Sequence, residues 1–247
     1  MKKSLSKHQI KAFDHNEFVE DQARDFISLV GAESNGGKVV TDIGGGCGYF
    51  AKRLAYLAGY KVRVIDMDEV SVKQCWRTDV EATCGDALNP HVTGDEDIVS
   101  FNMILHHLVG TSEQVTLDLQ RSALAVWLPH VRAVFVNEYI YESYIGNLSG
   151  WLIFQITKSR ILSWIGRAVS NVMPSLKANT FGVGVRFRAH QEWLRLFASA
   201  GYNVKSCVIG NKECISLPRR LLLIKCIRRD SFLLSKSSMV DKRLFHG

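Results

Sequence analysis

A glycine-rich turn between a buried strand and a helix limits most strongly what this 247-residue chain can fold into. The turn reads Asp42-Ile-Gly44-Gly-Gly46-Cys-Gly48, and it follows the apolar run VVTDI at 39–43. Glycine tolerates positive φ and lets the backbone approach a ligand closely. The first turn of the helix that follows offers free N–H groups to a carboxylate or phosphate. A plain tight turn is the alternative, but the position after a buried strand favours a ligand-binding βα unit.

Strands and helices continue to alternate beyond this turn. Apolar periodicity predicts strands at 39–43, 62–66, 82–84, 97–104 and 131–139, and helices at 49–57, 70–76 and 113–127. Such alternation is typical of parallel βαβ units, so we expect an α/β fold with a doubly wound sheet and helices on both faces. Two late apolar runs, 203–210 and 219–227, are close enough to pair antiparallel at one sheet edge. The sheet is therefore expected to be mostly parallel with an antiparallel last strand.

The pattern divides the chain into segments of one domain, 1–247. We expect an N-terminal helical segment at 1–37, with its helix at 16–30, and a cofactor-binding core at 38–140. The alternation stops at 141–187, a helical insertion after the fifth strand. Residues 188–228, with a helix at 190–202, complete the core, and the polar residues 229–247 form a tail that is expected to be mobile.

The insertion is too rich in large apolar side chains for a solvated loop. Its apolar residues could pack on the core, or they could form a lid over an apolar substrate pocket. A third possibility is contact with a membrane surface, which suits the tryptophans and cations Trp151, Lys158, Arg160, Trp164 and Arg167. The sequence leaves these three roles open.

Charge and cysteine content narrow the possible partners. The net charge of +7 favours anionic ligands or surfaces, but lysine and arginine are scattered, so nucleic acid is not the expected partner. The six cysteines form no CxxC pair, so no metal site is expected. The first residues lack the pattern of a secretory signal, and no apolar run is long enough to cross a bilayer. Together these features predict a cytoplasmic protein with reduced thiols.

Two nucleoside cofactors fit the glycine turn. The spacing Gly46-x-Gly48-x-x-Ala51, with Asp66 twenty residues beyond Gly46, satisfies the dinucleotide fingerprint. A nicotinamide-dependent oxidoreductase is therefore one interpretation. The acidic residues that end the other strands favour a different cofactor.

Asp42 heads the pattern D-x-G-x-G-x-G, which resembles motif I of class I S-adenosylmethionine-dependent methyltransferases. In that family the acid and glycines hold the amino-acid half of the cofactor. Asp66 matches the acid that binds the ribose hydroxyls, and Asp86 in Gly85-Asp86-Ala87 matches the acid that faces the adenine amino group. DIVSFNMILHHL at 97–108 resembles the family's fourth strand and its following turn.

This resemblance covers roughly residues 30–228 and implies a Rossmann-like fold with S-adenosyl-L-methionine as cofactor. The residues that it assigns to cofactor binding are Asp42, Gly44, Gly46, Gly48, Tyr49, Asp66, Met67, Asp86, Ala87 and Asn102. By contrast, Asp68 and Asp97 are expected to be a helix cap or surface charges.

His106 and His107 follow the fourth strand, next to the expected position of the methyl donor. Small-molecule O-methyltransferases of the plant phenylpropanoid type carry their base histidine in a similar Leu-His turn, and the resemblance assigns that role to His106. It assigns to Glu138 the role of the base's carboxylate partner. The chain departs from this group at Phe187, where a second acidic partner is expected. Histidine suits the role because its ordinary pKa lies near neutral pH.

The expected function is therefore methyl transfer to a small aromatic or lipophilic acceptor, preferably to oxygen, with catalytic residues His106, His107 and Glu138. One alternative is C-methylation of a quinone-like or lipid acceptor at a membrane surface, and another is methylation of RNA or protein. A non-catalytic cofactor-binding partner protein and the nicotinamide enzyme are the rivals from other classes. The sequence does not predict an oligomeric state.

Overall fold

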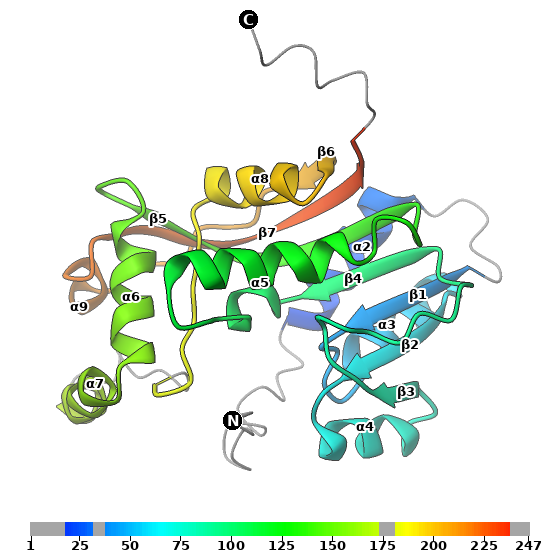
Figure 1. The fold of residues 1–247 in the computed structure, drawn as a ribbon, viewed down its shortest axis with the longest axis horizontal. Helices are drawn as coiled ribbons and strands as arrows, with labels where there is room; N and C mark the ends of the chain where they lie inside the picture. Colours follow the sequence, from blue (N-terminus) through cyan, green and yellow to red (C-terminus); the bar gives the residue numbers. More distant parts are fainter. Residues whose placement is uncertain (1–17, 32–37, 173–180, 238–247) are drawn as a thin grey trace, which may run out of the picture.

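The computed structural model describes residues 18–31, 38–172 and 181–237, which build an α/β fold around one seven-stranded sheet (Figure 1). The strands are β1 (Val39–Ile43), β2 (Lys61–Asp66), β3 (Glu81–Cys84), β4 (Ile98–Asn102), β5 (Ala133–Ser143), β6 (Tyr202–Val208) and β7 (Ile224–Lys236). Their order across the sheet is β3-β2-β1-β4-β5-β7-β6. Strands β1 to β5 run parallel, and β7 pairs antiparallel with both β5 and β6. The doubly wound sheet with an antiparallel last strand is confirmed.

Helices cover both faces of this sheet. They are α2 (Val19–Val30), α3 (Tyr49–Ala58), α4 (Glu69–Trp76), the 3-10 turn η2 (Leu105–His107), α5 (Glu113–Ala125), α6 (Leu148–Lys158), α7 (Arg160–Val172), α8 (His190–Ser199) and α9 (Leu217–Arg220). Helices α5 and α8 lie on one face, and α2 and α3 lie on the other (Figure 1). The sheet is thus the middle layer of three, as expected for a doubly wound fold.

Each face has its own apolar core. Trp127, Trp193 and Phe197 are fully buried between the sheet and the α5–α8 layer. On the opposite face Phe26 packs edge-on against Phe50 and other rings, with a centroid distance of 5.9 Å for this pair. Because both faces of the central strands β1 and β4 are buried, these strands consist of mostly apolar runs without strict alternation.

The prediction of a mobile tail is wrong for 229–236. These residues belong to β7, which lies between β5 and β6. The run looks polar because of Asp230 and Ser231, but both side chains are fully buried and hydrogen-bonded, and Phe232 next to them fills the core. The core therefore continues past its predicted boundary at residue 228. Residues 238–247 lie outside the described part of the chain.

The helical insertion forms as two unequal helices. Helix α6 packs against β5 and buries Phe154 and Thr157, whereas α7 lies further out and is largely exposed. Strand β5 also runs three residues into the predicted insertion, to Ser143. Among the described residues, no helix is both long and apolar enough to span a bilayer.

Candidate functional site

The glycine turn has the conformation that its sequence predicts. Gly44, Gly46 and Gly48 all adopt positive φ, at 69°, 55° and 76°. A Cβ atom at Gly44 would lie 2.6 Å from the side chain of Ile104, so a larger residue would collide there. Gly48 is the N-cap of α3, and Tyr49 begins that helix. The turn is held by its own backbone: the N–H of Gly44 donates to the Ile65 carbonyl at 2.7 Å, and the N–H of Gly48 donates to the Gly45 carbonyl at 3.0 Å.

Asp42 is completely buried beneath the turn. Its Oδ1 accepts hydrogen bonds from Ser100 Oγ at 2.6 Å and from Asn102 Nδ2 at 2.9 Å. Its Oδ2 has no hydrogen-bond partner within the described chain, although it is buried and close to Gly45. Burial raises the pKa of this carboxyl to about 7. A carboxylate oxygen without a partner, at the foot of a glycine turn, is suited to bind a cationic group such as an ammonium.

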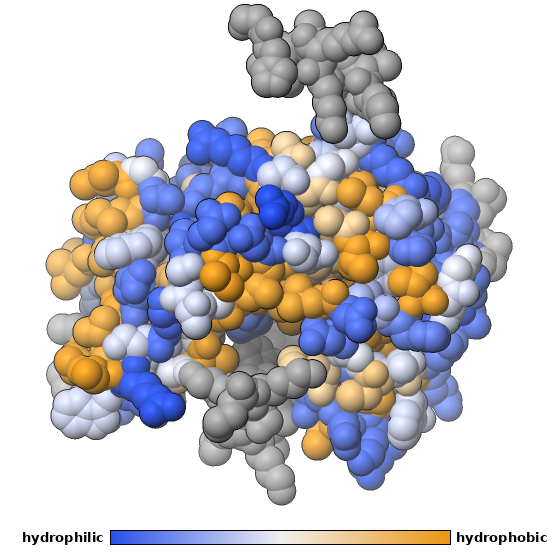
Figure 2. All heavy atoms as spheres, viewed as in Figure 1, coloured by the Kyte–Doolittle hydropathy of each residue, from blue (hydrophilic) through white to orange (hydrophobic). Residues whose placement is uncertain are grey.

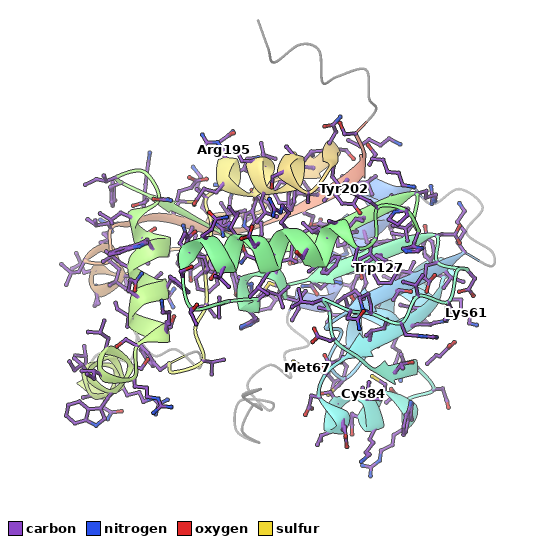
Figure 3. The ribbon with its side chains drawn as sticks, in the orientation of Figure 1. Lys61, Met67, Cys84, Trp127, Arg195 and Tyr202 are labelled. Atoms are coloured by element: carbon purple, nitrogen blue, oxygen red, sulfur yellow. The ribbon has the colours of Figure 1, made fainter. Side chains whose placement is uncertain are left out.

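Asp66 is the last residue of β2, and its carboxylate holds the glycine turn by a hydrogen bond. One carboxylate oxygen accepts the Gly46 N–H at 2.9 Å, and the other accepts the Asp68 N–H at 2.8 Å. Each carboxylate oxygen has two lone pairs, so both can accept a further hydrogen bond from a hydroxyl. Met67, next in the chain, is 59% exposed beside this site (Figure 3).

The remaining cofactor candidates lie at the same edge of the sheet. Asp86 and Ala87 follow β3, and Asp86 accepts the Leu88 N–H at 3.0 Å in a local turn. Asn102 ends β4. The structure thus brings residues from the carboxyl ends of four neighbouring parallel strands together, at the edge where open α/β sheets bind ligands.

The two other aspartates have structural roles, as expected from the sequence. Asp68 is the N-cap of α4 and accepts the Ser71 N–H at 2.9 Å. Asp97 accepts the Val39 N–H at 2.9 Å and so fixes the start of β1. Neither one needs a ligand to explain its position.

His106 and Glu138 form a buried pair beside the glycine turn. Nδ1 of His106 lies 2.7 Å from Oε2 of Glu138, and Oε1 of Glu138 accepts the Leu105 N–H at 2.7 Å. An ionised carboxylate only accepts hydrogen bonds, so this contact requires a proton on Nδ1 of the imidazole. In the neutral ring Nε2 then carries the lone pair. The arrangement makes His106 a candidate base with a fixed tautomer.

Aromatic side chains surround this pair. The ring of Phe187 lies 4.9 Å from that of His106, and it stacks on Tyr141 at 4.2 Å with an interplanar angle of 9°. Tyr139, two residues earlier on β5, is 6.1 Å from the His106 ring. The ring of His107 lies 4.1 Å from that of His106. Burial, and then the charge of His106, hold the pKa of His107 well below its usual value.

Sequence reasoning missed the buried ion network behind this cluster. Arg186 has no exposed surface, and its guanidinium contacts Glu113 at 2.8 Å and Glu192 at 3.0 Å. Arg188 donates to Gln120 at 2.8 Å. The backbone N–H of Arg186 also donates to the His106 carbonyl at 2.9 Å.

This network positions the ring of Phe187, because the buried arginines on either side hold its backbone. Burial alone would raise the pKa of Glu113, but the hydrogen bonds and charges of Arg186 and Arg188 lower it. The alternating Arg-Phe-Arg at 186–188 is the sequence feature that could have indicated this network. It indicates an extended segment with both arginines on one side.

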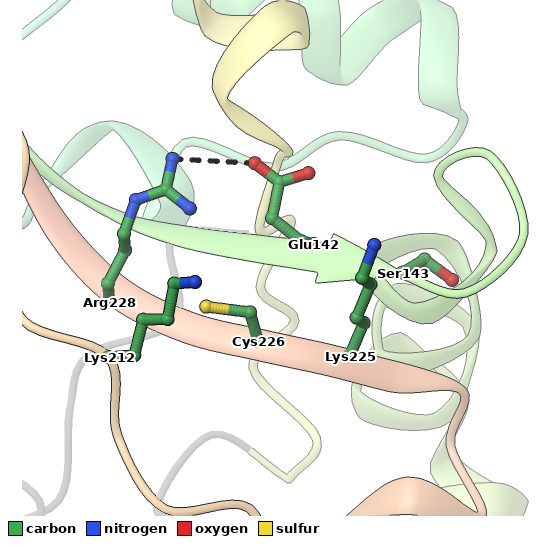
Figure 4. Close-up of a pocket in the computed structure, with 6 residues that line it drawn as sticks. All are labelled: Glu142, Ser143, Lys212, Lys225, Cys226 and Arg228. Atoms are coloured by element: carbon green, nitrogen blue, oxygen red, sulfur yellow. Dashed lines mark hydrogen bonds and ion pairs between the residues drawn. The ribbon is translucent and has the colours of Figure 1, made fainter.

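A separate pocket of about 260 Å³ lies further along β5 and β7 (Figure 4). Its lining is Glu142, Ser143, Lys212, Lys225, Cys226 and Arg228. Arg228 and Glu142 are 3.5 Å apart, and they form the ion pair drawn in Figure 4. None of the predicted cofactor or catalytic residues lines this pocket. Beside the carboxyl end of β4, Figure 2 shows a second, shallow hollow in the surface.

The described residues offer no cluster of three or more His, Cys, Asp or Glu side chains that could hold a metal ion. The site at the carboxyl edge therefore consists of the glycine turn, the strand-end acids and the His106–Glu138 pair.

No protein-family model and no curated protein sequence matches this chain. Solved structures match it by shape. The mitomycin 7-O-methyltransferase MmcR has a TM-score of 0.54 and 11% identity, over 89% of this chain and 54% of its own. Magnesium protoporphyrin IX methyltransferase from Synechocystis PCC 6803, with bound S-adenosylhomocysteine, has a TM-score of 0.54 and 13% identity, over 96% and 90%. The cyclase SpnF has a TM-score of 0.56 and 14% identity, over 89% and 80%.

The chain thus spans about half the length of the mitomycin methyltransferase. Likeness at these identities establishes the fold alone, a Rossmann-like fold that the chain shares with these two methyltransferases and with the cyclase.

Proposed function

We propose that this chain, which has the class I methyltransferase fold, binds S-adenosyl-L-methionine and transfers its methyl group to a small aromatic or lipophilic acceptor, preferably at oxygen. The observation that carries the proposal is the meeting of Asp42, Asp66 and Asp86 around the glycine turn at one sheet edge. The bound cofactor supplies an electrophilic methyl group on a sulfonium. The protein then has to align the two reactants and exclude water.

Each strand-end acid has a matching part of the cofactor. The unpartnered Oδ2 of Asp42 would accept from the ammonium of the methionine part, which is the only cation there besides the sulfonium. Asp66, while still bracing the turn, would accept from the ribose hydroxyls. Asp86 would face the adenine amino group, with Met67 and Ala87 on either side of the base. The orphaned oxygen and the glycine turn fit a ligand that presents a cation and close-packed polar atoms.

For a hydroxyl acceptor, His106 is the proposed base. Glu138 would hold the proton on Nδ1, which would leave Nε2 free to take the proton of the acceptor hydroxyl. The bound cofactor would supply the methyl group to the acceptor oxygen, and its sulfonium sulfur would leave as a neutral thioether. The rings of Phe187 and Tyr139 lie beside the His106 ring, and Tyr141 stacks on Phe187, so flat apolar surface adjoins the imidazole. This surface supports an aromatic or lipophilic acceptor.

The matched structures include both O-methylation and another chemistry. MmcR is named a mitomycin 7-O-methyltransferase, whereas SpnF is named a cyclase, so the fold does not determine the reaction. The second candidate is therefore a protein that binds the cofactor without transferring its methyl group. Formation of S-adenosylhomocysteine from S-adenosylmethionine in the presence of phenolic acceptors separates the two.

Calorimetry tests cofactor binding directly. We expect S-adenosylhomocysteine to bind in the micromolar range, and Asp66→Ala to weaken it at least about tenfold, because hydrogen bonds to a charged acceptor contribute about 1.5–3 kcal/mol each. Asp68→Ala is the matched control, since this neighbouring carboxylate caps α4. Tighter binding of a nicotinamide dinucleotide, or equal weakening by both substitutions, would contradict the proposal.

A further inference from the structure

Helix α7 turns its apolar face away from the protein. Ser163 is 2% exposed, and its Oγ donates to the Ile156 carbonyl at 2.8 Å. A Cβ atom at Gly166 would lie 2.6 Å from the ring of Phe181. Ser163 and Gly166 of α7 thus face inward. The large apolar ones face outward: Ile161 (73% exposed), Leu162 (41%), Trp164 (72%), Ile165 (45%) and Val169 (40%).

This orientation is the reverse of the usual one. An amphipathic helix on a globular domain normally buries its apolar face and exposes its polar face. A contiguous exposed apolar face marks a surface that meets another apolar phase. The chain therefore keeps on α7 a face that is unfavourable in water.

The exposed apolar surface continues beyond α7 at the same end of the molecule. Tyr144 and Ile145, before α6, are 57% and 61% exposed, and Leu217 and Leu221, in and after α9, are 78% and 79% exposed. The Tyr144 N–H donates to the Leu223 carbonyl at 3.0 Å, which joins these two segments. Helices α7 and α9 both lie at the left end of the long axis in Figure 1, and apolar side chains gather along that end in Figure 2.

Positive charge accompanies this surface, and the carboxylates that border it, Glu213 and Glu142, lie 3.9 and 3.5 Å from Arg219 and Arg228. The sequence contains no aspartate or glutamate at 143–191 or at 214–229, while lysine and arginine recur in both runs. Arg160 at the start of α7 and Arg220 at the end of α9 are exposed. Lys212 and Lys225 add two cations in the pocket beside α9 (Figure 4).

We propose that the outward face of α7, with the neighbouring exposed residues of α9 and of the loop before α6, is a docking surface for anionic lipid bilayers. Tryptophan and aliphatic side chains enter the interfacial region, and the flanking arginines and lysines meet the phosphate groups. A second copy of the chain fits less well, because a two-fold interface would oppose like cationic rims. This inference does not rest on the proposed methyl transfer, because docking requires neither cofactor nor acceptor.

Vesicle flotation tests the proposal with the full chain. We expect the protein to float with vesicles containing about one third phosphatidylglycerol in phosphatidylcholine, and to remain largely free with phosphatidylcholine alone. Ile161→Glu/Trp164→Glu should lower the bound fraction on the anionic vesicles at least about tenfold, because it places two anions on the inserted face. Arg160→Gln/Arg220→Gln should reduce binding and weaken its dependence on salt.

Tyr56→Glu/Val70→Glu is the matched control, because it adds the same charge at exposed apolar residues of α3 and α4. It should float like the parent chain, and circular dichroism should show all variants folded. Equal loss in the control and α7 variants would overturn the proposal, as would flotation that is unchanged by the α7 substitutions. A parent dimer that the α7 variant converts to monomer, without any vesicle binding, would also overturn it and assign the surface to self-association.

Discussion

At the scale of single residues, the buried Asp42 lowers the stability of the fold while it offers a carboxylate to a ligand. The chain buries a carboxyl with one satisfied and one unpartnered oxygen, and burial raises its pKa to about 7. In the unfolded chain the same group has its ordinary, much lower pKa. Between roughly pH 4 and pH 7 the native state therefore binds more protons than the unfolded state. The free energy of unfolding should fall as the pH rises through this window, and the loss is complete above it.

Asp42→Asn removes this penalty while keeping an oxygen for Ser100. We expect the free energy of unfolding of the variant to exceed that of the parent by about 1–3 kcal/mol at about pH 8, with a smaller difference at about pH 5. The variant should therefore unfold at a higher temperature than the parent at about pH 8. Its affinity for S-adenosylhomocysteine should fall about tenfold or more, because the cation loses a charged acceptor. Thermal denaturation at the two pH values and calorimetry measure these effects. A stability change that is independent of pH would mean that Asp42 is ionised when buried.

The His106–Glu138 pair makes a prediction about tautomers. In Glu138→Gln the amide oxygen must face the Leu105 N–H, so the amide N–H₂ faces Nδ1 of His106. Nδ1 then has to accept, the proton moves to Nε2, and the base loses its lone pair. We expect Glu138→Gln to lower turnover nearly as much as His106→Ala, by about 10²–10⁴-fold, with cofactor affinity unchanged.

His107→Ala is the control for this pair, because its ring touches His106 but does not take the place of Glu138. It should retain most of the turnover. If His107→Ala lowered turnover and His106→Ala did not, the base would be His107 and the proposed assignment would be wrong by one position. If all three variants were fully active, proximity alone would carry the reaction, as for an acceptor that is already ionised.

The sequence was sufficient to predict those site residues that stand in a local motif at the end of a strand. Asp42 and Asp66 are the last or nearly last residues of recognisable strands, and His106 follows β4 directly, so their meeting follows from parallel topology. Arg186 and Arg188 could not be assigned in this way. Their partners on α5, Glu113 and Gln120, are distant in the chain, and only the packing of that helix determines the pairing.

At the scale of elements, the two helices of the insertion differ: α6 packs against the core, and α7 lies outside it. Thr157 on α6 accepts the Val185 N–H at 3.1 Å, and Gly150 lies directly against the backbone of Phe187. Helix α6 therefore supports the segment that carries the aromatic ring onto His106. Helix α7 contacts a different segment: Arg167 donates to the Phe181 carbonyl at 2.7 Å, and Gly166 lies against the Phe181 ring.

Gly150→Ala tests the supporting role of α6. The added methyl would collide with the Phe187 carbonyl and the Arg186 guanidinium, so the 185–188 segment has to move. A small displacement near the reacting groups is costly, and we expect turnover to fall about tenfold to a hundredfold, with cofactor affinity unchanged. Ala168→Ser on the exposed side of α7 is the control, and it should leave turnover intact. A loss of cofactor affinity in Gly150→Ala would mean that α6 also shapes the glycine-turn side of the site.

Periodicity could not predict the orientation of α7. The sequence predicts a helical insertion at 141–187, and helix α7 forms within it at Arg160–Val172. A periodic pattern gives the angle between apolar and polar faces, but it does not indicate which face meets the protein. The contacts of Ser163 and Gly166 decide that, and they exist only in the folded chain.

At the scale of the whole molecule, the sequence pattern was sufficient to predict the sheet and its antiparallel last strand, but not how far that strand extends. Parallel strands buried on both faces give clear apolar runs, which is why β1, β2, β4 and β5 were predicted close to their true bounds. The middle of β7 carries the charged run Arg228-Arg229-Asp230, at the point where the predicted strand ended. Asp230 pairs with His190 on α8 and with Arg228, so a buried polar cluster resembled a solvated tail.

The last prediction concerns β7, which holds β6 to the rest of the sheet. Phe232 is fully buried and packs against Phe197 at a centroid distance of 5.2 Å. Phe232→Ser removes that ring and buries a hydroxyl, so we expect a loss of about 3–5 kcal/mol, a large share of the roughly 5–15 kcal/mol that stabilises a typical domain. Lys236→Ser, at the exposed end of the same strand, should change stability by less than about 0.5 kcal/mol.

Urea denaturation of both variants measures the difference. A chain that ends at Arg228 would lose most of β7, and with it the antiparallel pairing to Tyr202–Val208, so we expect it to be recovered unfolded or aggregated. If that shortened chain instead unfolded cooperatively at the same urea concentration as the parent, β7 would contribute nothing to the sheet. The polar run after residue 228 would then behave in solution as the tail that its composition suggested.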